Sequence, residues 1–187
     1  TTTHPLVVEA AARLLLDWGA ARVTIADSPG GPYTKPLLHG IYETCGMTEA
    51  ARQSGAALNE DTGFTTLRRE ENRLVREFSI INPVAEADLL VSVCKLKTHS
   101  MTTLSGGVKN LFGCIPGLQK PELHLRFPDK SDFGEMLVDL ALTVQPALTL
   151  VDAVVGMEGD GPSGGSPRKL GFLAACRDPF LLDLCLA

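Results

Sequence analysis

The stretch Asp88–Cys94 (DLLVSVC) is a short run of apolar and β-branched residues, and it is the clearest indication of the fold class. Such a run predicts a buried strand. Two similar runs follow at Leu148–Val151 (LTLV) and Gly171–Ala175 (GFLAA), and a shorter one precedes it at Arg22–Ala26 (RVTIA). The sequence therefore predicts four strands spread along the chain.

Residues with helical spacing lie between these runs. Apolar positions recur every three or four residues over Phe133–Val144, with Ser131 as the expected cap and Pro146 as the stop. The same spacing covers Leu6–Trp18, where Pro5 suits the first turn. Strands separated by helices favour an α/β fold with a mainly parallel sheet and helices on both faces. We expect residues 1–187 to form a single α/β domain.

Both ends of the sequence are abrupt. Thr1–His4 leads directly into the first helix, and a helix that opens at Asp178-Pro179 stops at Ala187. We therefore expect the chain to be a fragment of a longer protein, truncated at both ends.

Composition excludes several classes of function. The chain is 44% hydrophobic, which is enough for a core, and its net charge of −5 with 5% aromatic residues argues against nucleic-acid binding. No apolar run approaches the length of a membrane span, so we expect no membrane partner. The five cysteines form no C-x-x-C pair, which favours free, reduced thiols and a cytoplasmic location.

Polar residues follow each predicted strand. Asp27 ends the first, the second runs into Lys95–His99, Asp152 ends the third, and Arg177-Asp178 ends the fourth. In open parallel sheets, ligands bind outside the carboxyl ends of the strands. The pattern predicts one shared site there. The alternative is loop polarity scattered over the surface, and Asp178 is better explained as a helix cap.

The segment from Lys95 to Gly117 is the densest in polar groups. Ser105, Gly106 and Gly107 let the backbone approach a ligand, and their N–H groups are predicted to hold an anion. Lys97, Lys109 and Asn110 would add donors and positive charge, with Asp27 facing them. His99 is the best candidate for acid–base chemistry, since its ordinary pKa lies near neutrality. The alternative is a glycine-rich turn with solvated lysines.

A second set of residues predicts a metal site. His124, Asp152 and Glu158 supply an imidazole and two carboxylates, which are ligands for a divalent metal. The acidic loop from Asp152 to Gly165 is either a lid that supplies these carboxylates or a plain surface connection. The mixed charge run from Arg68 to Glu77 is interpreted as a solvated face.

Several motifs in order make the chain resemble domain-of-unknown-function family 362, over essentially all 187 residues. The markers are Thr2–Pro5 (TTHP), Asp27–Gly30 (DSPG), Lys95–His99 (KLKTH), Gly107–Gly113 (GVKNLFG), Val151–Ala153 (VDA), Glu158–Pro162 (EGDGP) and Asp178-Pro179. Members of this family are often joined to a ferredoxin-like module with two 4Fe-4S clusters. The resemblance implies that such a module, and any redox role, would lie outside this chain.

A more limited similarity links residues 99–117 to the nickel-pincer lactate racemase family. His99, Ser105–Lys109 (SGGVK) and Pro116-Gly117 follow that family's order, and His124 stands where a metal-binding histidine is expected. This similarity implies that Lys109 carries a cofactor. Asn110–Phe112 departs from the pattern.

Three hypotheses follow. The first is an enzyme domain that binds a small anionic substrate or cofactor, with His99 and Lys109 as catalytic residues. The second is a non-catalytic module that docks a partner or supports the ferredoxin part. The third is a metal-dependent racemase or isomerase, which requires His99, Lys109 and His124 around one cavity.

Overall fold

The computed structural model describes residues 2–187, and its helices and strands are interspersed along the chain. The strands are β1 (Thr24–Ile25), β2 (Ala57–Leu58), β3 (Phe64–Arg68), β4 (Glu77–Ile81), β5 (Val91–His99), β6 (Thr103–Ser105), β7 (Leu148–Glu158) and β8 (Ser166–Cys176). The helices are α1 (Pro5–Asp17), α2 (Lys35–Thr44), α3 (Met47–Ser54), α4 (Asn82–Ala85), α5 (Gly107–Asn110), α6 (Gln119–Arg126), α7 (Lys130–Val144) and α8 (Pro179–Leu186), with a 3₁₀ turn, η1, at Leu111–Cys114. The α/β class is as predicted.

The main sheet is mixed, so the prediction of a mainly parallel sheet was wrong. Its order is β6-β5-β7-β8, and only the β5–β7 pair is parallel. The antiparallel strands β6 and β8 each form a hairpin with the strand that precedes them. β1 pairs in parallel with β2 in a separate two-stranded sheet, and β3 and β4 form an antiparallel pair.

Because β8 runs antiparallel to β7, its carboxyl end lies at the opposite edge of the sheet. Arg177 and Asp178 therefore do not join the polar residues that follow β5 and β7. Asp178 caps α8 by accepting the N–H groups of Phe180 and Leu181 at 2.8 and 3.0 Å, which confirms its capping role.

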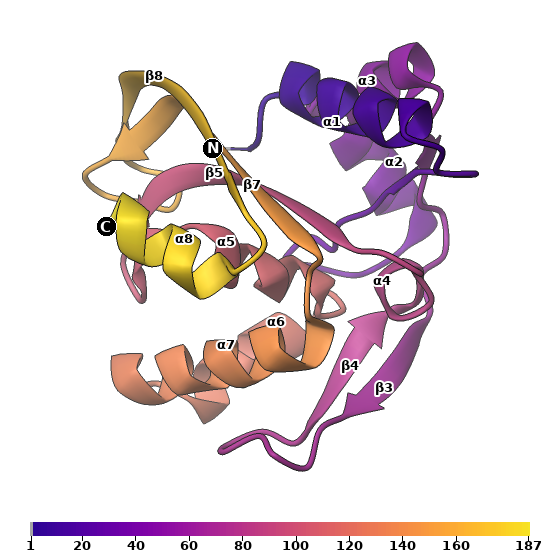
Figure 1. Ribbon diagram of the computed structural model, residues 1–187. Coiled ribbons are helices and arrows are strands. Elements are labelled where there is room, and N and C mark those ends of the chain that lie inside the picture. The colour runs from indigo at the N-terminus through magenta and orange to yellow at the C-terminus, as the bar shows by residue number, and fades with distance from the viewer. Residues whose placement is uncertain (1) are drawn as a thin grey trace.

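Helices lie on both sides of the main sheet. Figure 1 shows α1, α2 and α3 gathered on one side, with α5, α7 and α8 on the other. Successive side chains on β5 and β7 point to opposite faces of the sheet, so both faces can pack against helices. Cys94, Leu96, Val151 and Ala153 form one apolar cluster with Leu182 of α8.

The largest core cluster packs α7 against β4 and the 3₁₀ turn η1. It contains Phe78, Ile80, Leu111, Phe112, Phe133, Met136 and Leu140, among others. The cap of α7 is Asp129 rather than the predicted Ser131: its carboxylate accepts the N–H groups of Ser131 and Asp132. The helix thus begins at Lys130.

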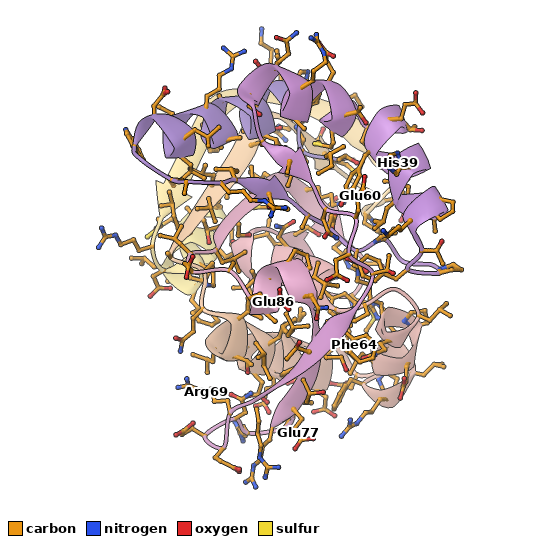
Figure 2. The ribbon with its side chains drawn as sticks, turned by 90° about the vertical axis from the view of Figure 1, so that its right-hand side faces the viewer. His39, Glu60, Phe64, Arg69, Glu77 and Glu86 are labelled. Carbon is orange, nitrogen blue, oxygen red and sulfur yellow. The ribbon has the colours of Figure 1, made fainter. Side chains whose placement is uncertain are left out.

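The β3–β4 hairpin extends from the body of the molecule, and Figure 2 shows Phe64, Arg69 and Glu77 along it. Its charge run is solvated, as predicted. Arg68 pairs with Glu70 at 2.5 Å and with Glu77 at 2.6 Å, and all three side chains are more than half exposed. Within residues 2–187, no helix is both long and apolar enough to cross a bilayer.

Candidate anion-binding site

Asp27 stands at the end of β1, in a crowded but solvent-accessible position. Its Oδ1 accepts the N–H of Ser28 at 2.8 Å, and a Cβ at Gly113 would lie 2.7 Å from the same oxygen. Loss of bulk water around the carboxyl raises its pKa, while Lys120, the Ser28 N–H and Lys97 oppose the rise. Gly113, the last glycine of the G-V-K-N-L-F-G motif, is therefore needed because its backbone lies close to the Asp27 carboxylate.

Lys97 and His99 come from β5, which continues through residues predicted to lie beyond its end. They stand two positions apart, so their side chains lie on the same face of the strand. The Lys97 pKa is lowered by burial and partly restored by Asp27. The His99 pKa is lowered to about 4 by burial, and then by the charges of Lys109 and Lys97 and by His124.

The tautomer of His99 follows from its hydrogen bond. Nδ1 accepts the N–H of Met101 at 3.0 Å, so it carries no proton. A neutral imidazole then holds its proton on Nε2. His99 is therefore a neutral hydrogen-bond donor at pH 7, rather than the acid–base group poised near neutrality that its ordinary pKa suggested.

Lys109 lies on α5 with its ammonium against aromatic rings. Nζ is 4.3 Å from the centroid of Phe112 and 5.8 Å from that of Phe133. Burial lowers its pKa to about 8, with further contributions from Lys120 and Lys97. The ring faces favour a cation but supply no negative charge.

Lys120 and His124 are supplied by α6. Lys120 is only 8% exposed, and its Nζ donates to the carbonyl of Ser28. Burial lowers its pKa, and Asp27 opposes that shift. His124 stacks on Phe133 with centroids 4.5 Å apart, and its pKa is lowered by burial and by Lys109.

These six side chains act on one another electrostatically, and we call them the lysine cluster: Asp27, Lys97, His99, Lys109, Lys120 and His124. The Asp27 carboxylate acts on Lys97 and Lys120, and Lys109 adds a third ammonium group that interacts with both lysines, so the cluster has excess positive charge. The sequence prediction missed Lys120. Its signal was the P-G turn at Pro116-Gly117, which starts the short helix that carries this lysine back to the loop after β1.

The glycine-rich segment does not form the predicted cradle for an external anion. The N–H groups of Gly107 and Val108 donate to the Asp183 carboxylate at 2.6 and 2.9 Å. A Cβ at Gly106 would lie 2.2 Å from the same carboxylate. The donors are therefore occupied by an internal anion from α8.

Ser105 and Asn110 also have structural surroundings. The Ser105 side chain is buried, and its Oγ has no partner within residues 2–187. Asn110 donates to Ser92 Oγ at 3.0 Å and to the Val93 carbonyl at 3.5 Å, which ties α5 to β5.

The three predicted metal ligands do not converge. Asp152 is fully buried and pairs with Lys95 at 2.5 Å, Glu158 pairs with Arg168 at 2.5 Å, and His124 stacks on a phenyl ring. In the part of the chain that the structure describes, no group of three or more His, Cys, Asp or Glu side chains is placed to hold a metal. The side chains present therefore do not fit a divalent metal or an iron–sulfur cluster.

Asp152 instead joins the first helix to the sheet. Its carboxylate accepts the backbone N–H groups of His4 at 2.9 Å and Val154 at 3.2 Å. Burial works against its charged form, but the Lys95 ammonium and these donors lower its pKa overall. The acidic segment after it is largely the long β7–β8 hairpin, whose turn accepts a hydrogen bond from Thr98 to the Gly159 carbonyl at 3.0 Å.

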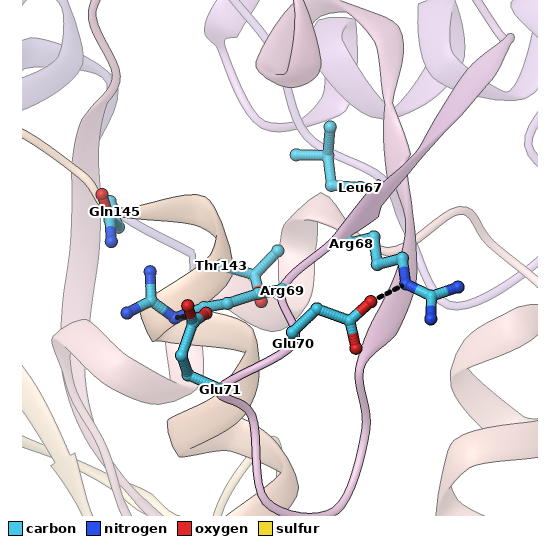
Figure 3. A pocket seen from close by; sticks show the side chains of 7 residues that line it. All are labelled: Leu67, Arg68, Arg69, Glu70, Glu71, Thr143 and Gln145. Carbon is cyan, nitrogen blue, oxygen red and sulfur yellow. Dashed lines mark hydrogen bonds and ion pairs between the residues drawn. The ribbon is translucent and has the colours of Figure 1, made fainter.

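A separate hollow of about 470 Å³ lies between the β3–β4 hairpin and the end of α7. Figure 3 shows its lining, in which Arg68 is bonded to Glu70 and Arg69 faces Glu71. Its positive and negative side chains are already paired with one another at the surface. It therefore lacks the charge imbalance that distinguishes the lysine cluster.

The family model for the domain of unknown function DUF362 matches residues 1–187. The chain belongs to this family. A thylakoid-associated protein of Synechocystis sp., sll1697, is 34% identical over 190 residues, which cover 98% of this chain and 56% of that protein. This DUF362 chain thus spans little more than half the length of that relative.

Among solved structures, the lactate racemase apoprotein of Thermoanaerobacterium thermosaccharolyticum is similar to this DUF362 chain. The match has a TM-score of 0.46 and 18% identity, and covers 98% of this chain and 54% of the racemase. Both resemblances predicted from the sequence motifs therefore recur in the comparisons. A structural match this distant carries no argument about activity.

Proposed function

We propose that this DUF362 domain binds a small, multiply charged anion at the lysine cluster, and that the anion is a substrate or cofactor of the full-length protein. The observation that carries the proposal is the gathering of Lys97, Lys109 and Lys120, of which only Lys97 and Lys120 interact with the Asp27 carboxylate, with the pKa of each lysine lowered. A bound anion would supply the missing negative charge.

Physical cost supports a functional role for this arrangement. Burial of these cations, and at Lys109 also the charges of Lys120 and Lys97, disfavours the charged forms and so destabilises the folded state, as the lowered pKa values express. Groups with shifted pKa values brought together in one place are typical of functional sites. Asp183 and Asp152 show that this chain can neutralise polar groups internally, and it does not do so fully at the lysine cluster.

His99 would take part as a hydrogen-bond donor. Its Nε2–H is free of the Met101 hydrogen bond, which engages Nδ1. An anion in the cluster would also raise the pKa values of His99 and Lys109, so that binding draws in protons near pH 8. Positioned donors of this kind stabilise negative charge that develops on a reacting oxygen.

A redox role, if the full-length protein has one, would depend on an iron–sulfur module outside these residues. Within residues 2–187, no cysteine group is placed to hold a cluster. Cys94 and Cys114 are buried, and burial raises the pKa of each thiol to about 12. This domain would then contribute the substrate site, and the attached module the electrons.

Isothermal titration calorimetry with inorganic phosphate tests the proposal. At pH 8, we expect binding with net proton uptake, seen as a dependence of the apparent enthalpy on buffer ionisation. Lys97→Met should weaken binding at least about tenfold, or about 1.4 kcal/mol. The matched control Lys169→Met alters an exposed lysine of β8 and should leave binding unchanged. Absence of binding, or equal losses in both variants, would overturn the proposal in favour of a docking module.

A further inference from the structure

We infer that the Lys109 amine is a nucleophile that condenses with the carbonyl group of an anionic oxo compound, such as a 2-oxo acid, to form an imine. This inference rests on the proposed anion-binding function and names the substrate class and the reacting atom. It is independent of any metal.

The surroundings of Lys109 distinguish it from the other lysines of the cluster. Lys120 donates to the Ser28 carbonyl, and both Lys120 and Lys97 are stabilised as cations by Asp27. Within residues 2–187, the Lys109 amine has no hydrogen bond or carboxylate partner. It rests on the rings of Phe112 and Phe133, which favour the ammonium form less strongly than a carboxylate partner would.

The charged side chains that act on Lys109 are both cationic. Lys120 and Lys97 both lower its pKa, and burial lowers it further, to about 8. A desolvated lysine beside other cations has a neutral, nucleophilic fraction at mildly alkaline pH. The same neighbours attract an anionic substrate, so the groups that activate the amine also bring the electrophile to it.

The reaction balances without an oxidant or reductant. The nitrogen lone pair of neutral Lys109 adds to the carbonyl carbon, and the two amine protons leave with the carbonyl oxygen as water. His99, with a proton on Nε2, is electrostatically coupled to Lys109 and is suited to polarise the carbonyl oxygen. Lys97 or Lys120 would hold the carboxylate or phosphate of the substrate.

Reductive trapping tests the inference. The chain is incubated at pH 8 with glyoxylate and sodium cyanoborohydride, and modified lysines are located by peptide mass spectrometry. We expect labelling of Lys109 at least about tenfold faster than of exposed Lys169, half-maximal near pH 8, and suppressed by inorganic phosphate. Labelling spread evenly over exposed lysines would overturn the inference.

A variant separates this inference from the proposed function. Lys109→Arg retains the positive charge but forms no such imine, so it should lose the specific label completely, whereas its phosphate affinity in calorimetry should fall less than that of Lys97→Met. Circular dichroism verifies that the variant is folded. Phosphate binding by the unaltered chain without selective labelling would refute the inference alone. Selective labelling without phosphate binding would refute the proposed anion site and the anionic substrate class, and would leave only the reactive Lys109 amine.

Discussion

Asp27 follows β1 and Asp152 lies within β7, and the surroundings of the two carboxylates differ. Asp152 is fully buried and has one ammonium partner and two backbone donors. Asp27 is a solvent-accessible residue whose carboxyl is crowded, and it interacts with Lys97 and Lys120, which outnumber it. The first carboxylate is neutralised by the fold, whereas the second leaves positive charge to be neutralised from outside.

This difference distinguishes a carboxylate that stabilises the fold, Asp152, from one that belongs to the proposed anion-binding site, Asp27. Both aspartates are equally prominent in the sequence, each as a polar residue after an apolar run. Only the count of surrounding charges, which requires the folded chain, distinguishes them. Stability should therefore depend on Asp152, and anion binding on the residues around Asp27.

The largest expected effect is the loss of stability in Asp152→Ala. This change leaves Lys95, whose side chain is 11% exposed, without its partner, and leaves the N–H groups of His4 and Val154 unbonded. We expect the free energy of unfolding in urea to fall by about 3–5 kcal/mol. Glu158→Ala, which breaks an exposed pair with Arg168, should cost less than about 1 kcal/mol. Equal costs would remove the distinction between the two kinds of carboxylate.

Lys109→Met should stabilise the domain while it abolishes imine trapping. Its pKa is lower in the folded chain than in the unfolded chain, so below pH 8 the folded state bears the full cost of its charge. Methionine keeps the contact with Phe112 and removes that cost. We expect about 1–2 kcal/mol of added stability at pH 7 by urea unfolding, less than the pKa shift alone implies because solvent screens the amine. A destabilised variant would mean that Lys109 has a structural role.

The pH dependence of stability should contain a contribution from His99. Its folded-state pKa of about 4 lies below the ordinary 6.5, so the unfolded chain binds more protons between these values. Stability should thus fall as pH decreases from 6.5 to 4. His99→Asn keeps an acceptor for the Met101 N–H and should flatten this part of the profile by about 1 kcal/mol. An unchanged profile would contradict the electrostatic account of His99.

The smallest effect is expected from Asp27→Asn. It removes the carboxylate that competes with an external anion for Lys97 and Lys120, while the amide oxygen can still accept the Ser28 N–H. We expect phosphate affinity at pH 7 to rise about threefold, or less than about 1 kcal/mol, by calorimetry. Weaker binding would show that Asp27 orients the lysines rather than competing with the ligand.

The sequence was informative where local chemistry determines the structure. The spacing of apolar residues located α1 and α7, and Asp178-Pro179 predicted the start of α8. It also pointed to Asp27, Lys97, His99, Lys109 and His124, which the fold brings within electrostatic reach of one another. The segment between β7 and β8 was interpreted as a loop rather than as the turn of a long hairpin, and so the antiparallel direction of β8 was not predicted.

The remaining differences arise from contacts between residues far apart in the chain. Asp183 reaches Gly107 across 76 positions, and Lys120 reaches Ser28 across 92. Neither contact has a local signature, so the sequence could not show that one polar segment was already neutralised or that a third lysine joined the cluster.

The most direct measurement is a crystal structure of the protein soaked in tungstate, whose anomalous scattering marks the position of a phosphate-like anion. The account predicts a peak within hydrogen-bond distance of at least two of Lys97, Lys109 and Lys120, and no peak at the N–H groups of Gly107 and Val108. A lysine cluster without a peak, in crystals where tungstate binds elsewhere, would contradict the claim that this site binds anions.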